Sequence, residues 1–415
     1  MNDSSIRKFF YLLYWAGVLL GGIYIFKCVI GTINYFVIIS LIGGCIIGII
    51  KSQSQDDYLK QTIALKTDNR VLVYDYLRCV ASIMVVAVHK IGADLAVAAE
   101  IQESNLYRNL DFTRLLCCSC NVIFVMLSGA LLLQYRDEKM IFFIKRRLSK
   151  IAIPLILYFY IYYLFFSADG NIEKVSIGVL IGRIISGKVG SVHALHFWFM
   201  YVLLFLYILF FFLRYMLKDI SYMLLSKMII FLFVLSIIEI CIPIELIDIK
   251  AWNLLGWCLI AIMGFWFTKD ETRKYDKLFI IAGIVSAIAM WVIYINDSDS
   301  VFISSNFSVL RYFVACGLFA LLYNLQKHLK NYFFIRFLSK YSYGMILIHH
   351  ICIGIITPKL APFSSLTHKG VGAIISILGV TIVSLIVAFF IENTFVAFYN
   401  GIFDVSLVRK IKKSK

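Results

Sequence analysis

The segment VLVYDYLRCVASIMVVAVHKI, residues 71–91, is an apolar run interrupted by a small number of ionisable side chains. An α-helix of this length is about 30 Å long, which matches the hydrocarbon core of a bilayer. Ionisable groups inside such a helix are rare, and each is a candidate for a functional position. The segment therefore predicts a transmembrane helix that carries part of a polar site.

The composition of the whole chain agrees with a membrane protein. Of its 415 residues, 61% are apolar and only 15% are charged, whereas about 25% are charged in soluble domains. A water-soluble fold of this size has too little interior for so much apolar surface, and disordered or collagen-like chains have different compositions. The chain has only four prolines, which favours long helices over the strands of a barrel.

Eleven further apolar runs have the length of a membrane span. The twelve predicted spans lie at residues 8–26, 32–50, 71–91, 114–134, 150–168, 195–214, 224–243, 252–268, 277–295, 307–326, 335–357 and 370–396. We divide the chain into an N-terminal two-helix hairpin with its cytoplasmic linker (1–66), a ten-helix core domain (67–400) and a basic cytoplasmic tail (401–415). The expected fold class is all-α, a polytopic transmembrane helix bundle of about twelve spans in a lipid bilayer.

The distribution of basic residues predicts the orientation of the bundle. Of the 40 Lys and Arg residues, 28 lie in segments on the same side as the N-terminus. The positive-inside rule therefore places both termini in the cytoplasm. The same pattern explains the net charge of +16 without a nucleic-acid partner. On the outer side we expect a loop over 91–113 and an interfacial amphipathic piece within 169–191.

Four polar residues of the 71–91 helix share one face. At 100° per residue, Asp75, Ser82 and His89 lie within about 60° of Arg78 around the helix axis. Arg78 and His89 are about 16 Å apart along that axis. One interpretation is an Asp75–Arg78 pair that snorkels toward the cytoplasm, with His89 at the outer interface. The other is a polar stripe that faces the interior of the bundle and performs chemistry.

Two further groups each have a structural and a functional interpretation. The basic patch at 145–150 anchors a cytoplasmic helix end, or it binds the phosphates of a nucleotide-like donor. Three histidines, His89, His196 and His349, are expected at a similar depth. Their spacing is dispersed and no carboxylate or cysteine accompanies them, so no metal site is expected.

Other polar residues in apolar runs are less informative. The C-x-x-C segment at 117–120 lacks the second element of a redox or metal site, so it predicts helix packing. Glu239 and Arg311 either face the interior of the bundle or lie at the membrane interface.

Five segments, in chain order, resemble the motifs of acyltransferase family 3, a family of integral-membrane O-acyltransferases. The family's opening motif is Asp-x-x-Arg followed after ten residues by His, and Asp75, Arg78 and His89 match it. The other matching segments are 121–129 (NVIFVMLSG), 145–154 (KRRLSKIAIP), 196–199 (HFWF) and 342–349 (SYGMILIH). The resemblance covers about residues 70–396. Lys150 stands where the family usually has the second arginine of Arg-x-x-Arg, and Glu392 lacks the proline that usually follows it.

The resemblance implies an acyltransferase in the cytoplasmic membrane of a bacterium. Such an enzyme transfers an acyl group, most commonly acetyl, from cytoplasmic acyl-CoA to a hydroxyl of a cell-surface or lipid-linked glycan. It implies that His89 is the general base or a transient acyl carrier, that Arg78 stabilises negative charge, and that Asp75 orients Arg78. The implied donor-binding residues are Arg146, Arg147 and Lys150, and the acceptor-side candidates are His196, Trp198, Tyr343 and His349.

Two other classes compete with this interpretation. A transporter or flippase of a glycan or lipid-linked sugar also suits a many-helix bundle with a polar stripe, but the chain has no clear repeat and no paired Gly/Pro-broken helices. The other class is a non-enzymatic sensor or assembly partner, whose N-terminal hairpin would dock glycan-assembly proteins. Loss of surface acetate in a deletion strain, with glycan export unchanged, would favour the enzyme.

Overall fold

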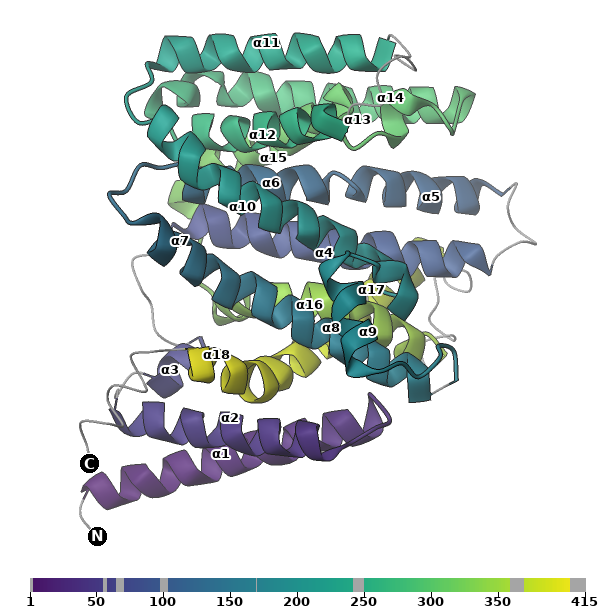
Figure 1. Cartoon of the computed structure of the whole chain (residues 1–415). Coiled ribbons are helices and arrows are strands. Elements are labelled where there is room, and N and C mark those ends of the chain that lie inside the picture. Colours follow the sequence, from purple (N-terminus) through teal and green to yellow (C-terminus); the bar gives the residue numbers. More distant parts are fainter. Residues whose placement is uncertain are drawn as a thin grey trace.

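The computed structural model describes residues 3–54, 58–64, 71–97, 104–168, 170–241, 250–358 and 369–403. Within these ranges the chain forms helices and no strand, which confirms the predicted all-α class. The long helices run roughly parallel to one another as a bundle. The hairpin of α1 (Asp3–Cys28) and α2 (Tyr35–Ser54) lies at one edge, and α11 (Tyr222–Cys241) lies at the opposite edge (Figure 1).

The remaining elements follow in chain order. The first half contains α3 (Tyr58–Thr62), α4 (Leu72–Ala96), α5 (Asn105–Cys117), α6 (Cys120–Leu132), α7 (Met140–Arg147), the π-helical turn η2 (Leu148–Ala152), α8 (Ile153–Ala168), α9 (Ile177–Ile185), η3 (Val189–Val192), η4 (Leu195–Phe197) and α10 (Trp198–Met216). The second half contains α12 (Lys250–Trp266), η5 (Asp270–Tyr275), α13 (Asp276–Asn296), α14 (Val301–Ser304), α15 (Val309–Asn324), η6 (Gln326–His328), α16 (Phe333–Ile356), α17 (Lys369–Ile391), the π-helical turn η8 (Glu392–Val396) and α18 (Ala397–Phe403).

Nine helical stretches in the described ranges are long and apolar enough to cross a membrane. Shorter apolar stretches lie in α11 (Tyr222–Leu235) and α12 (Gly256–Trp266). α16 has 24 residues and is long enough to span a bilayer, but it is not among these nine stretches. Lys340, His349 and His350 lower its hydropathy. The chain is thus a multi-pass membrane protein, while the count of twelve spans stays a prediction.

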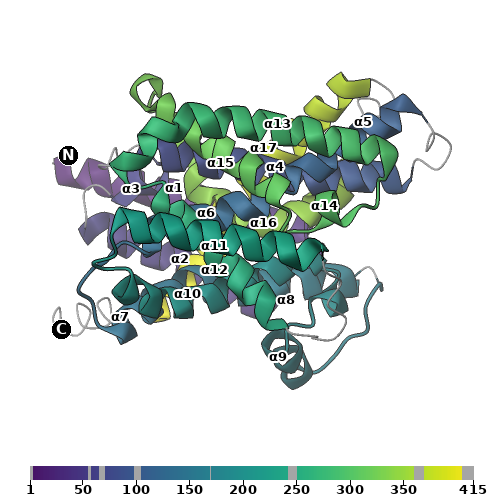
Figure 2. The same ribbon diagram turned by 90° about the horizontal axis from the view of Figure 1, so that it is seen from above.

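α4 occupies the middle of the bundle and packs against α5, α6, α16 and α17 (Figures 1 and 2). The helix limits predicted at 91 and 114 are wrong, because α4 continues to Ala96 and α5 begins at Asn105. A buried ion pair between Lys90 and Asp94, one turn apart, stabilises the extension of α4. Ser104 caps α5 by accepting a hydrogen bond from the backbone N–H of Tyr107.

The backbones of α6 and α12 meet at two glycines. A Cβ at Gly129 would lie 1.9 Å from the carbonyl oxygen of Ala261, and one at Gly264 would lie 1.8 Å from that of Met126. Small residues allow such close approach between helices in a membrane. Gly129 of the segment 121–129 therefore holds the wall formed by α6 against α12.

The N-terminal hairpin is fitted closely to the last helices of the core. α2 packs against η8 and α18, and α1 packs against α17. A Cβ at Gly44 would lie 2.0 Å from the carbonyl oxygen of Thr394, so the two backbones are in direct contact. α1 begins and α18 ends near the same end of the bundle (Figure 1). Beyond Phe403, the predicted tail lies outside the described residues.

The segment expected at the interface contains the short helix α9. Its nine residues are too few to span a bilayer. Among them Leu180 is buried, whereas Ile177, Val179 and Ile181 are exposed. This arrangement agrees with an interfacial piece.

Candidate active site

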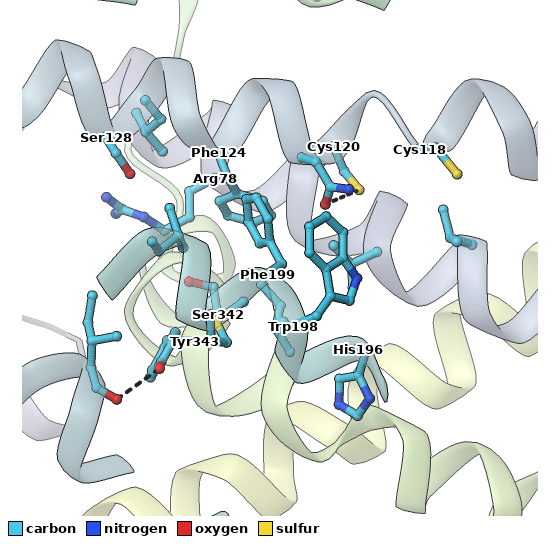
Figure 3. Close-up of a pocket in the computed structure, with 18 of the residues that line it drawn as sticks. Arg78, Cys118, Cys120, Phe124, Ser128, His196, Trp198, Phe199, Ser342 and Tyr343 are labelled. Carbon is cyan, nitrogen blue, oxygen red and sulfur yellow. Dashed lines mark hydrogen bonds between the residues drawn. The ribbon is translucent and has the colours of Figure 1, made fainter. Parts of the chain in front are cut away.

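A cavity of about 1270 Å³ lies in the core of the bundle, and its walls include α4, α6, α10 and α16. Its lining includes Cys118, just before α6, and Gln134, just after it, which corresponds to roughly 24 Å at the rise of an α-helix. We call the end lined by Arg78, Arg147 and Lys150 the inner end, and the end lined by Asp111 and Arg311 the outer end, following the predicted topology. In Figure 3, Arg78, Ser128 and Tyr343 lie toward one end, and Cys118 and His196 lie toward the other.

At the inner end, α4 and α16 are joined by a polar cluster. The Ser339 hydroxyl donates a hydrogen bond to Asp75 Oδ1 at 2.5 Å. Arg78 Nη1 donates to Ser339 Oγ at 2.9 Å and lies 3.5 Å from Asp75 Oδ1. Asp75 and Ser339 are buried, whereas Arg78 keeps part of its side chain exposed and lines the cavity. The predicted Asp75–Arg78 pair therefore exists, and it faces the bundle interior.

Two π-helical turns contribute to the inner wall. η2 carries Lys150 and Ile151, and η8 carries Glu392; all three residues line the cavity. π-helical turns occur frequently at functional sites because they displace side chains from the regular helical register. A Cβ at Gly344 of α16 would lie 2.8 Å from Glu392 Oε1, so the glycine of the segment 342–349 makes room for this carboxyl group.

Arg147 lines the same end of the cavity and is only half-buried. Its Nε has no hydrogen-bond partner, and its guanidinium carbon lies 5.5 Å from the centre of the Phe143 ring. This ring supports the guanidinium from one side. Arg147 is thus held in place with donor capacity to spare.

Four histidine rings gather near the middle of the cavity. His350 Nε2 and His89 Nδ1 are 3.2 Å apart, and the centre of the His89 ring lies 5.0 Å from that of His349 and 5.7 Å from that of His196. His89 and His196 line the cavity, whereas His349 is completely buried behind them. One polar cluster therefore joins α4, η4 and α16.

The hydrogen bonds of the cluster assign protons to two of the rings. His349 Nδ1 lies 2.6 Å from the carbonyl oxygen of Ile346, so Nδ1 carries the proton and Nε2 has the lone pair. That Nε2 is buried without a partner. His196 Nε2 lies 3.3 Å from the carbonyl oxygen of Leu347, which leaves Nδ1 of His196 as the acceptor.

The same cluster is the group of residues best placed to hold a metal ion. One donor atom from each of His89, His349 and His350 lies within 4.8 Å of the others. Three histidines form a known ligand set of catalytic zinc. No metal was expected because the spacing of His89, His196 and His349 in the sequence is dispersed. The fold instead brings His89, His349 and His350 together.

At the outer end, the wall is formed by a broken helix. α5 ends at Cys117 and α6 begins at Cys120. Irregular backbone at membrane depth is tolerated where it lines a cavity, and both Cys118 and Cys120 do so. The segment 117–120 therefore has a role in shaping the cavity besides helix packing. Next to it, Asn121 Nδ2 donates to Asn306 Oδ1 at 3.4 Å.

The structure brings most of the predicted site residues to one cavity. Its lining includes Asp75, Arg78, His89, Arg147, Lys150, His196, Trp198 and Tyr343. Arg146 does not line it; its side chain is exposed and pairs with Glu138. Tyr343 lies at the inner end, where its hydroxyl donates to the carbonyl oxygen of Ile151 at 2.9 Å, rather than on the acceptor side. Ser82 donates to the carbonyl oxygen of Arg78 and does not line the cavity.

Three residues of the site were not predicted to take part in it, although Glu392 was already named in the comparison with the family motifs. Ser339 bridges Asp75 and Arg78, Glu392 lines the inner end, and His350 contacts His89. The sequence gives no signal for His350, because adjacent residues point about 100° apart on a helix. The side chain of Glu239 lies outside the described residues.

The comparisons with known proteins agree with the geometry. The family whose sequence profile is described as an acyltransferase domain, acyltransferase family 3, matches residues 72–393. No curated protein and no solved structure matches the chain. The matched region begins with α4 and ends within η8, so it contains most of the cavity lining and leaves the N-terminal hairpin outside. The chain therefore belongs to acyltransferase family 3, a family of membrane acyltransferases.

Proposed function

We propose that this acyltransferase takes an acyl group, in the first instance acetyl, from cytoplasmic acyl-CoA and transfers it to a hydroxyl of a cell-surface or lipid-linked glycan. The observation that carries the proposal is a single cavity lined by Arg147 and Lys150 at its inner end and by His89 and Trp198 farther along. With both chain termini in the cytoplasm, the inner end of the cavity would face the cytoplasm, where acyl-CoA is made. An extended acyl-CoA arm that lies along the cavity accounts for the separation of about 16 Å between Arg78 and His89.

The inner end suits a phosphorylated donor. Arginine presents forked donors that match phosphate oxygens, and Arg147 has an unpartnered Nε beside the cavity. Lys150 adds a second positive charge from η2. Because Arg78 lies at this end, held by Ser339 and Asp75, we assign it to stabilising negative charge on the donor.

The Arg147→Ala variant should raise the KM for acyl-CoA by about tenfold or more, because a hydrogen bond to a charged group contributes about 1.5–3 kcal/mol. The KM for the acceptor should stay unchanged. Steady-state kinetics on the purified full chain would measure both constants. Arg146→Ala is the matched control, since Arg146 carries the same charge but does not line the cavity. An unchanged donor KM in Arg147→Ala would leave the basic patch with a role in topology alone.

His89 is suited to accept the proton of the attacking hydroxyl. In the tautomer that carries its proton on Nδ1, this N–H donates to His350 Nε2 across 3.2 Å, and Nε2 of His89 keeps its lone pair. The hydroxyl oxygen then attacks the thioester carbonyl while its proton moves to Nε2. The C–S bond breaks, and the CoA thiolate leaves and takes up the proton. Transient transfer of the acyl group to His89 is the alternative route.

His350 is in this mechanism a positioning residue, because it acts only through His89. His350→Ala should lower kcat by about 10–100-fold, the range expected for one lost hydrogen bond to a charged group. The KM for acyl-CoA should not change. His350→Asn retains a carbonyl acceptor and should recover part of the rate. A purely structural role would instead lower the amount of folded protein in both variants alike.

We expect this mechanism to need no resident metal, because His89 and His350 serve as hydrogen-bond partners of each other. Transfer should therefore continue at an unchanged rate after treatment with a zinc chelator. Elemental analysis of the purified protein should find well below one zinc per chain. One bound zinc together with loss of activity on chelation would reassign His89, His349 and His350 as ligands.

Transport of a glycan or lipid-linked sugar is the second candidate function. The observation that favours it is the length of the cavity, whose lining extends from Cys118 past α6 to Gln134, roughly 24 Å. Transport needs no proton acceptor, so the substitutions of His89 and His350 separate the two functions.

A further inference from the structure

Arg311 is a buried cation at the outer end of the cavity. It lies in the first turn of α15, its residue is 2% exposed, and it lines the cavity. Its Nε has no hydrogen-bond partner within the described ranges of the chain. Among the residues that the structure describes, no carboxylate forms an ion pair with it. A guanidinium in such a place is unfavourable until an anion compensates its charge.

The carboxylates of Asp111 and Asp299 line the same cavity, but among the described residues neither forms an ion pair with Arg311. Arg114 is engaged with Asp111, whose Oδ1 lies 2.6 Å from Arg114 Nη2. Asp111 Oδ2 also accepts a hydrogen bond from the Tyr294 hydroxyl at 3.0 Å. The carboxylate of Asp111 is therefore engaged by Arg114 and Tyr294 and does not neutralise Arg311 directly.

Neighbouring groups add neutral donors for an anion. Asn121 and Asn306 line the same cavity as Arg311. Arginine and amide side chains together form a set of donors that recognises carboxylates and phosphates.

We propose that the outer end of the cavity binds an anionic group, a carboxylate or a phosphate, on the glycan acceptor, with Arg311 as its main contact. That the ligand is the acceptor rests on the proposed function, whereas the anion site itself does not.

The site and the proposed base belong to one cavity. Arg311, Arg114 and His89 all line it, as do Trp198 and His196. An acceptor held by its charge at Arg311 would therefore bring a hydroxyl of the same sugar toward His89. This geometry selects charged sugars over neutral ones.

Binding can be tested without acyl transfer. The purified full chain in lipid nanodiscs is titrated with sodium glucuronate, with glucose as the neutral match and with inorganic phosphate, all at equal ionic strength. The midpoint of thermal unfolding reports binding. Glucuronate, phosphate or both should raise the midpoint, and glucose should not. A response to glucuronate alone indicates a uronate-type acceptor, and a response to phosphate alone indicates a phosphorylated one.

Variants locate the site. Arg311→Gln should weaken the anion response at least about tenfold, and Arg311→Lys, which keeps the charge but loses the fork, should weaken it less. Arg183→Gln on α9, outside the cavity lining, should change nothing. If Arg311→Gln does not fold, the comparison of glucuronate with glucose on the wild-type chain still tests whether an anion binds. The Arg311→Lys variant then tests whether Arg311 makes the contact.

Two results would overturn the proposal. One is a wild-type chain whose midpoint responds to no anion. The other is an anion response that survives Arg311→Gln but disappears in Arg147→Gln, which would place the anion at the donor end. Loss of acyl transfer with an intact anion response would instead count against the proposed function alone. In kinetic assays, substitution of Arg311 should raise the KM for charged acceptors if Arg311 recognises the acceptor. If Arg311 instead stabilises the transition state, its substitution would lower kcat for every acceptor.

Discussion

The His89→Ala variant is expected to lose acyl transfer by about 10²–10⁴-fold, the usual effect of removing a general base. His89 lines the cavity, contacts His350, and occupies the motif position that follows Arg78 after a gap of ten residues. Its ring is not needed to hold α4 in place, because Val86, Lys90 and Ile91 around it are buried in the packed bundle. Acyl groups transferred per minute at equal membrane protein abundance measure the effect.

The matched control is His328→Ala, since His328 lies exposed in η6, away from the cavity. It should transfer acyl groups at the wild-type rate. Near wild-type activity of His89→Ala would exclude His89 as the base and turn attention to His196 and His349. If an acyl-His89 intermediate forms, label from acyl-CoA should stay on the wild-type protein when acceptor is withheld, and His89→Ala should not retain it.

The Gly264→Val variant is expected to lose most of the folded protein from the membrane. A Cβ at this position would lie 1.8 Å from the carbonyl oxygen of Met126, a backbone atom that cannot rotate away. Overpacking costs about 1–3 kcal/mol even where side chains can adjust, and here α12 and α6 must separate. Since α6 forms a wall of the cavity, the remaining protein should also lose activity.

Gly178→Val is the matched control for this substitution, because a Cβ at Gly178 would meet nothing within 4 Å. The yield of monodisperse protein after extraction, together with its thermal midpoint, measures both variants. A Gly264→Val protein as abundant and as stable as Gly178→Val would mean that α6 and α12 do not touch as described.

The helical period was enough to predict which residues of α4 act together. Asp75, Arg78 and His89 fall on one face by spacing alone, and all three line the cavity. The same arithmetic also included Ser82, which instead turns its hydroxyl to the carbonyl oxygen of Arg78. A short polar side chain can satisfy itself within its own helix, and helical spacing does not reveal that choice.

Contacts between distant segments could not be predicted from one sequence. Ser339 meets Asp75 across 264 positions of the chain, and only the packing of α16 on α4 brings them together. The same packing carries both His349 and His350 to His89, although adjacent residues point about 100° apart on a helix. The motif glycine at 129 was visible in the sequence, but its reason lies in the backbone of α12.

Transmembrane acyl transfer is the central claim, and reconstituted vesicles test it most directly. The purified chain is inserted into liposomes that enclose an acidic sugar acceptor, and acyl-CoA with a labelled acyl group is added outside. The account predicts that the label appears on the enclosed sugar as an ester, that free CoA accumulates outside in equal amount, and that the His89→Ala vesicles do neither. Sugar that crosses the membrane without gaining label, at the same rate in wild-type and His89→Ala vesicles, would contradict the account and identify a transporter.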